Sequence, residues 1–248
     1  MRPVICMITD RRRFGGAGLG SGLGSGLGSG PAGGRAGAGR GQARGRPGAG
    51  PGDAEDALVA LVGAAARGGI DLVQVRERDL DGGALVRLVA RCLAASRQTR
   101  TRVLVNDRVD VAMAAGAHGV HLRGDSVAAP RVRALVPPGF LIGRSIHSRE
   151  EAEHVSAEGG VDYLMFGTVF STPSKPGVAA AGIQALADVV SASPLPVLAV
   201  GGITLDTAHG LRRTRAAGIA AIGVFTDTAS GDLPRTISDL AHAFQDED

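Results

Sequence analysis

The chain has 248 residues, enough for one large α/β domain or two small ones; 44% of them are hydrophobic and 3% aromatic, a composition typical of parallel strands covered by helices. Residues 11–52 hold seven Arg and no acidic residue, so this segment carries +7, and the formal net charge of +3 leaves −4 for the rest. Two widely separated cysteines, Cys6 and Cys92, argue against a disulfide framework or a cysteine metal pair, and no apolar run approaches the roughly 20 residues of a membrane span.

The first predicted element is a short apolar strand at 4–8, followed by Thr9 and Asp10. This run lacks the length and the cleavage site of a signal peptide. Because the two separate cysteines also fit a reducing compartment, we expect a cytoplasmic protein.

A low-complexity segment follows the first strand. Residues 15–52 are nearly all Gly, Ala, Arg, Ser and Pro, with a Gly-Leu-Gly-Ser repeat at 18–29. Such a segment cannot bury enough apolar surface to offset the entropy of ordering, so we predict a disordered insert. Its G-x-G-x-x-G matches open no helix and do not indicate a dinucleotide site. Without interleaved aromatic residues it favours a solvated spacer over a nucleic-acid contact.

Outside this insert, strand and helix patterns alternate, which predicts a single-domain (β/α)8 TIM barrel, with an open doubly wound sheet as the alternative. The predicted strands span 4–8, 70–75, 102–105, 118–122, 140–145, 162–167, 195–200 and 219–224. The predicted helices span 54–67, 81–97, 109–115, 127–135, 149–158, 182–192, 205–216 and 233–244, with N-caps at Asp53, Ser148 and Asp232. The first strand and its end thus occupy 1–14, the insert 15–52 and the remainder of the barrel 53–248.

Chemistry in such a barrel gathers at the C-terminal ends of the strands. Polar or glycine residues do follow most of the predicted strands, and one rim is therefore the predicted functional face. These residues are Thr9, Asp10, Gln74, Arg76, Asn106, Asp107, His121, Asp125, Ser145, His147, Thr172, Lys175, Gly201, Gly202 and Gly223.

After the second strand, Gln74, Arg76 and Arg78 alternate with other residues, so an extended chain directs all three to one face. Two cations and an amide there suit an anionic ligand with a heteroaromatic part. The alternative is a surface strand in which the arginines pair with Glu77 and Asp79.

After the third strand, Asn106 and Asp107 follow a buried run. A carboxylate beside a phosphate site is a natural ligand for Mg²⁺, which usually takes one or two carboxylates together with phosphate and water. The alternative role is an N-cap for the helix at 109–115.

The fourth strand carries His121, for which a core histidine with satisfied hydrogen bonds is the favoured interpretation. Gly201-Gly202 follows the seventh predicted strand, and Ile222-Gly223 lies near the end of the eighth. Their backbone amides could approach a phosphate, as in many barrels; the alternative is a tight turn without a ligand.

Lys175 is the only lysine among 27 cationic side chains and lies in a run of hydroxyls, two prolines and a glycine. Lysine is a compact point charge suited to phosphate or pyrophosphate. The alternative is a surface lysine present by chance.

Taken in order, these segments resemble the thiamine-phosphate synthase family, which includes the thiazole tautomerases. The matching stretches are Met7-Ile8-Thr9-Asp10-Arg11, Val73-Gln74-Val75-Arg76-Glu77, Val105-Asn106-Asp107-Arg108-Val109-Asp110, Gly119-Val120-His121-Leu122, Ile142-Gly143-Arg144-Ser145-Ile146-His147, Asp162-Tyr163-Leu164-Met165-Phe166-Gly167, Thr172-Pro173-Ser174-Lys175-Pro176-Gly177 and Ala199-Val200-Gly201-Gly202-Ile203. The resemblance implies a transferase that joins 4-amino-2-methyl-5-(diphosphomethyl)pyrimidine to a thiazole phosphate. The products would be thiamine phosphate and pyrophosphate, with Mg²⁺ as cofactor.

The resemblance also implies the roles of individual residues. Gln74 and Ser145 would face the pyrimidine, and Asp107 would bind Mg²⁺. Pyrophosphate would be held by Arg76, Asn106 and Lys175, with Arg78 where the family usually has lysine. The thiazole phosphate would be held by Thr172 and Ser174 and by the backbone at Gly202, Ile222 and Gly223. Lys175, Arg76 and Ser145 form the expected catalytic set.

Two further features of the sequence bear on the choice of activity. The second Mg²⁺ carboxylate of the family falls at Ser126, and the nearest acid, Asp125, is one residue early, so Asp125 is the expected substitute. The missing acid argues against the synthase, whereas tautomerases tend to have a histidine where this chain has Thr168, which argues against a tautomerase. The alternatives to the synthase are therefore a thiazole tautomerase-like isomerase and a non-catalytic phosphate-binding barrel. The expected partners are small phosphorylated heterocycles, with a homo-oligomer possible and neither a membrane nor nucleic acid expected.

Overall fold

The computed structural model describes residues 2–14, 51–172 and 177–244. Eight parallel strands form a closed barrel in chain order, with β8 pairing back to β1. The strands are β1 Val4–Ile8, β2 Leu72–Val75, β3 Arg102–Asn106, β4 Gly119–Leu122, β5 Leu141–Ile146, β6 Tyr163–Phe166, β7 Val197–Val200 and β8 Gly218–Ala221. The predicted TIM barrel is confirmed, and the open doubly wound sheet is excluded because β1 and β8 are hydrogen-bonded to each other.

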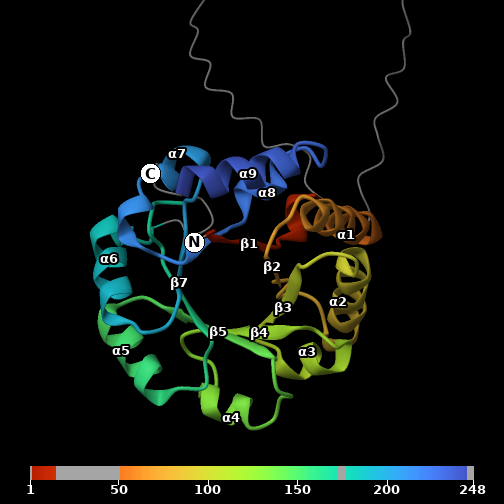
Figure 1. The fold of residues 1–248 in the computed structure, drawn as a ribbon. Coiled ribbons are helices and arrows are strands. Elements are labelled where there is room, and N and C mark those ends of the chain that lie inside the picture. The colour runs from red at the N-terminus through yellow and green to blue at the C-terminus, as the bar shows by residue number, and fades with distance from the viewer. Residues whose placement is uncertain (1, 15–50, 173–176, 245–248) are drawn as a thin grey trace, which may run out of the picture.

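Helices surround the strands in a ring (Figure 1). They are η1 Arg11–Arg13, α1 Pro51–Arg67, α2 Gly82–Ser96, α3 Val109–Ala115, α4 Ala129–Arg133, α5 Arg149–Glu158, α6 Gly182–Ala192, α7 Leu205–His209, η2 Arg212–Thr214, α8 Gly223–Thr226 and α9 Leu233–Phe244. Helix α5 begins as predicted, since the Ser148 hydroxyl accepts a hydrogen bond from the Glu151 N–H at 3.2 Å. No helix in the described ranges is long and apolar enough to span a membrane.

Several predicted elements have different bounds in the structure, and three of these differences have a clear physical or structural basis. Strand eight was expected to reach residue 224 but ends at Ala221, and α8 begins at Gly223. A short apolar run is compatible with either strand or helix, so periodicity could not place this boundary. Helix α1 begins at Pro51, a residue type that fits the first helical turn, so Asp53 lies within that turn and is not the N-cap. The helix predicted at 205–216 is divided into α7 and η2.

The predicted insert lies almost entirely outside the described residues, which resume at α1. Helix α1 and η1, the elements on either side of the undescribed segment, contact each other. The described residues that flank the predicted insert therefore lie close together, at the side of the barrel where β1 ends.

Two layers of buried side chains hold the barrel together. The larger layer lies between the strands and the helices. The smaller one fills the barrel interior and consists of Cys6, Ile8, Leu72, Leu104, Tyr163, Met165, Leu198 and Ala220. Residue 143 must be glycine for the Tyr163 ring to fit in the interior, because a Cβ at Gly143 would lie 2.2 Å from Cζ of Tyr163. A large aromatic ring thus occupies the interior, and its hydroxyl lies within the barrel.

Candidate active site

Three cavities lie at the C-terminal ends of the strands and share lining residues. A central cavity of about 270 Å³ borders one of about 210 Å³ through Arg78, Asn106 and Arg123. The central cavity also borders one of about 420 Å³ through Thr172, Gly201 and Ile222. The three form a continuous site that runs from the end of β2 to the end of β8.

The predicted face of β2 lines the central cavity with Gln74, Arg76 and Arg78. Glu77 points away from it: the buried carboxylate accepts hydrogen bonds from Thr9 and from the backbone and side chain of Arg11. Burial raises the pKa of Glu77, and these hydrogen bonds oppose the rise. Asp79 also pairs with Arg11, at 2.7 Å.

Arg76 and Arg78 consequently have no ion-pair partner among the described residues, which overturns the alternative in which they pair with Glu77 and Asp79. Arg76 is half-buried. Burial lowers the pKa of Arg76, and the neighbouring charge of Arg78 lowers it further. Two cations are thus available to an anion in this cavity.

The floor of the central cavity is polar and uncharged. Gln74 is 2% exposed, and its Nε2 donates to Oδ1 of Asn106 at 2.9 Å. Its Oε1 is buried and has no hydrogen-bond partner among the described residues. His121 is 1% exposed, with Nδ1 3.0 Å from the Tyr163 hydroxyl and Nε2 2.9 Å from the Ser145 hydroxyl. The prediction of a satisfied core histidine is confirmed, and one of its partners is a predicted substrate-binding residue.

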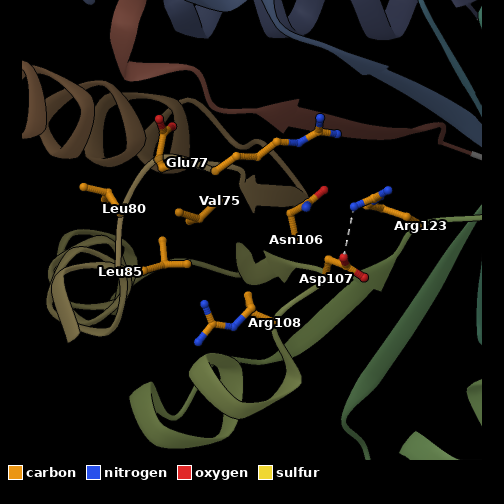
Figure 2. Close-up of a pocket in the computed structure, with 9 residues that line it drawn as sticks. Val75, Glu77, Leu80, Leu85, Asn106, Asp107, Arg108 and Arg123 are labelled. Carbon is orange, nitrogen blue, oxygen red and sulfur yellow. Dashed lines mark ion pairs between the residues drawn. The ribbon is translucent and has the colours of Figure 1, made fainter. Parts of the chain in front are cut away.

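Asp107 directly follows strand β3 and lines the cavity of about 210 Å³ (Figure 2). Its φ of 62° is in the left-handed region, which Asp tolerates better than most residues. Its Oδ1 accepts a hydrogen bond from the Ser126 hydroxyl, and its Oδ2 lies 3.6 Å from Nη1 of Arg123. The N-cap residue of α3 is Arg108, so the alternative role of Asp107 as that cap is wrong.

The loop after β4 is held by Arg144 on β5. Its guanidinium donates to the backbone oxygens of Val127 at 2.8 Å and Gly124 at 2.9 Å, with a longer bond to Ser126. In this conformation the carboxylate of Asp125 pairs with Arg123 and its side chain is 69% exposed. The structure therefore brings Ser126, and not Asp125, onto Asp107.

The donor set around Asp107 fits a Mg²⁺ ion that takes few ligands from the protein. Asp107 supplies one carboxylate, and no group of three His, Cys, Asp or Glu side chains gathers anywhere in the described residues. Magnesium commonly binds through one or two carboxylates and completes its octahedron with phosphate oxygens and water. The pair of Arg123 with Asp107 places a competing cation at the same carboxylate.

The third cavity has a glycine-rich wall made by Gly201, Gly202, Ile222 and Gly223. Gly202 has φ of 65°, and a Cβ there would lie 2.6 Å from the backbone oxygen of Ser171. The turn is therefore tight, as the alternative interpretation held, but it also borders a cavity large enough for a ligand.

Sequence reasoning missed several arginines of the site. Arg12 and Arg123 line the central cavity. Arg13 lines the third, and its Nη1 donates to Thr226 at 2.9 Å and to Asp227 at 2.7 Å. The sequence analysis counted Arg12 and Arg13 only in the charge of residues 11–52, whereas their place directly after strand one was a usable signal. Ser174 and Lys175 lie outside the described residues.

Comparisons with known proteins agree on one family. A family model described as thiamine monophosphate synthase matches residues 49–225. A thiamine-phosphate synthase from Anaeromyxobacter dehalogenans is 43% identical, over 66% of this chain and 73% of the relative. One from Roseiflexus castenholzii is 38% identical, over 68% of this chain and 74% of the relative.

A solved structure supports the fold. The thiamine phosphate pyrophosphorylase from Pyrococcus furiosus superposes with a TM-score of 0.71 at 24% identity, covering 97% of this chain and 95% of that one. The family model spans most of the barrel, and both sequence relatives align over about two thirds of the chain. The chain therefore belongs to the thiamine monophosphate synthase family.

Proposed function

We propose that this chain is a thiamine-phosphate synthase, a transferase that joins a diphosphorylated aminopyrimidine to a thiazole phosphate and releases pyrophosphate. The observation that carries the proposal is the continuous site described above. Its β2 end offers guanidinium groups that have no ion-pair partner in the described part of the chain, its centre is uncharged and polar, and its β8 end has a glycine wall. These three environments suit pyrophosphate, a neutral heterocycle and a monophosphate, in that order along the site.

At the β2 end, Arg76, Arg78 and Arg123 would hold the pyrophosphate, together with Asn106. When the bond between the pyrimidine methylene and the diphosphate breaks, both electrons leave with pyrophosphate. Fixed guanidinium groups stabilise that growing negative charge without having to reorganise. Lys175, by resemblance, would add a further cation to this end.

Mg²⁺ would be held by Asp107, and when bound it supplies positive charge that neutralises the departing pyrophosphate. The Ser126 hydroxyl, which contacts Asp107, would orient this carboxylate. Asp125 remains the expected second acid only if the loop after β4 changes conformation on binding, because Asp125 is engaged by Arg123.

In the centre, Gln74 and Ser145 would bind the pyrimidine and hold its methylene carbon toward the thiazole. At the other end, Thr172, Ser174 and the backbone at Gly202, Ile222 and Gly223 would hold the thiazole phosphate. This arrangement leaves the thiazole nitrogen free to attack the methylene carbon. The benefit is largely one of proximity and orientation.

The two alternative functions are less well supported. Thr168, at the position where tautomerases tend to have histidine, lines the central cavity and is 7% exposed. His147 lies close to Thr168, but its Nδ1 is hydrogen-bonded to the backbone oxygen of Gly167. A turnover assay distinguishes the synthase from a non-catalytic phosphate-binding barrel.

A cytoplasmic location is part of the same proposal. Cys6 and Cys92 are both free and buried, and burial raises the pKa of each thiol to about 12. Unreactive buried thiols of this kind are compatible with a reducing compartment.

The test is a turnover assay with purified protein, Mg²⁺ and both phosphorylated heterocycles, with chromatographic detection of thiamine phosphate. We expect product that disappears with EDTA and with Asp107→Ala. Lys175→Ala should abolish turnover but only weaken the binding of either heterocycle. A well-folded protein that binds both compounds and forms no product would contradict the proposal and favour the binding barrel.

A further inference from the structure

We propose that Tyr163 and His121 are positioning residues that fix the direction of the Ser145 hydroxyl. In that direction Ser145 donates a hydrogen bond into the central cavity and selects a heterocycle with a ring nitrogen as acceptor. The identity of the heterocycle, an aminopyrimidine, rests on the proposed function. The hydrogen-bond geometry does not, because it belongs to the protein alone.

The three side chains come from three neighbouring strands and form one chain of hydrogen bonds. Tyr163 lies on β6, His121 on β4 and Ser145 on β5 between them. The Tyr163 hydroxyl is 3.0 Å from Nδ1 of His121, and Nε2 of His121 is 2.9 Å from the Ser145 hydroxyl. The absence of a side chain at Gly143 admits the tyrosine, since a Cβ there would lie 2.4 Å from its hydroxyl oxygen.

His121 is held neutral by its surroundings. Both ring nitrogens face hydroxyl groups, and the ring is buried in the barrel interior. A charge on this buried ring would have no carboxylate partner among the described residues, so the neutral form is favoured. The neutral ring has one N–H, so one nitrogen donates and the other accepts.

Tyr163 decides which nitrogen carries the proton. Burial raises the pKa of Tyr163 well above its usual value, so the phenol keeps its proton. Within the described residues, the only hydrogen-bond partner of this hydroxyl is Nδ1 of His121. If Nδ1 carried the proton, the phenolic hydrogen would be buried without an acceptor, which is unfavourable. Nδ1 is therefore the acceptor, and Nε2 carries the N–H.

This assignment determines what Ser145 can do. Its oxygen accepts from Nε2–H of His121, which leaves its own O–H without a partner in the described structure. Ser145 lines the central cavity, so that hydrogen is available to a ligand. Gln74 supplies the complementary group: its Nε2 donates to Asn106, and none of the described residues donates to its buried Oε1.

The floor therefore presents one donor and one acceptor and no charge. A heterocycle with a ring nitrogen and an amino group satisfies both. An analogue in which the relevant ring nitrogen is replaced by C–H leaves the Ser145 hydrogen unpaired, and sites of this kind discriminate against such analogues.

The first test reads the tautomer directly, by ¹⁵N NMR of the His121 ring in the ligand-free protein. We expect protonation at Nε2. Tyr163→Phe keeps the ring that packs against Gly143 and removes only the hydroxyl, so we expect it to lower the Nε2–H fraction in favour of Nδ1–H. Ser145→Ala is the matched control and should leave the tautomer unchanged, because the constraint comes from the tyrosine.

The second test measures binding by calorimetry of the diphosphorylated aminopyrimidine and of its two aminopyridine analogues, each with one ring nitrogen replaced by C–H. We expect one analogue to bind the unmodified protein roughly fivefold to tenfold more weakly. In Tyr163→Phe and in Ser145→Ala this difference should shrink to about twofold or less. Thermal melts establish that each variant is folded.

Each outcome bears on the inference. Protonation at Nδ1 in the unmodified protein, or equal binding of all three compounds, would overturn it even if the protein turns over. A tautomer and a binding preference as expected, in a protein without synthase turnover, would support the inference and contradict the proposed function alone. An unchanged binding preference in Tyr163→Phe would remove Tyr163 from the positioning role.

Discussion

The floor of the central cavity, formed by Gln74, His121 and Ser145, carries no net charge, whereas its rim carries Arg76, Arg78 and Arg123. Floor side chains come from strand residues and are hydrogen-bonded to one another or to neighbouring strands. Rim side chains follow the strand ends, and Arg123 is 45% exposed. The contrast has a physical reason: burying an unpaired charge is costly, whereas neutral side chains that hydrogen-bond to one another are tolerated in the barrel interior.

The difference separates two tasks. A neutral floor can recognise the shape and the hydrogen-bonding pattern of a ring, while a solvent-accessible cationic rim can take up and release pyrophosphate. The predictions below test this division from the largest expected effect to the smallest.

The largest effect should come from the half-buried rim arginine. Arg76→Ala should lower kcat/KM by about 10²–10³-fold, because a fixed cation in a partly dry site stabilises developing charge strongly. The matched control is Arg78→Ala on the same face, which is exposed and should cost about tenfold, since water screens its charge. Steady-state kinetics measure both. A larger loss of kcat/KM in Arg78→Ala than in Arg76→Ala would contradict the proposed order of importance of the two rim arginines.

Because His121 in the floor is neutral in the folded protein, the free energy of unfolding should depend on pH. The pKa of His121 is lowered to about 4 in the folded protein, compared with about 6.5 for an unperturbed histidine. The unfolded chain therefore binds a proton at a higher pH than the folded one, and stability is lost as pH falls from about 6.5 toward 4. The histidine accounts for at most about 3 kcal/mol of this loss.

Chemical denaturation at several pH values, compared with His121→Gln, isolates this contribution. The variant should lack the part of the pH dependence that comes from the histidine. Parallel curves for the two proteins would show that the floor is not held neutral in the folded state.

The metal requirement should depend on Asp107 and not on Asp125. Asp107→Asn should raise the Mg²⁺ concentration needed for half-maximal activity by about 10–100-fold. Asp125→Asn is the control and should change it by less than about twofold, because this side chain is exposed and paired with Arg123. Ser126→Asp, which adds a carboxylate beside Asp107, should lower the requirement. If Asp125→Asn had the larger effect, the loop after β4 would have to rearrange when the metal binds.

The smallest effect should fall at the β8 end of the site. Gly202→Ala introduces a Cβ against the Ser171 backbone oxygen at a positive φ. It should raise KM for the thiazole phosphate about tenfold with little change for the pyrimidine. Gly231→Ala is the control, because a Cβ there meets no atom within 4 Å. An equal rise in both KM values would mean that the two ends of the site are not independent.

Much of the fold and part of the site could be predicted from local sequence. The alternation of apolar strands and helical patterns was enough for the barrel. The period of two in an extended chain was enough to place Gln74, Arg76 and Arg78 on one face. Less could be said of Asp107 and the residues around it, because their contacts depend on loops.

The sequence by itself determined the barrel, the face of β2 and the rim at which polar residues gather, since these follow from backbone geometry that repeats every few residues. Only the tertiary structure decided three sets of hydrogen bonds. Ser126 donates to Asp107, and Arg11 donates to Glu77. His121 is hydrogen-bonded to both Tyr163 and Ser145. Each of these contacts joins residues 19 to 66 positions apart. Such pairs form only when the strands close into a barrel and the loops adopt their final conformations. Local sequence patterns do not encode contacts over these separations.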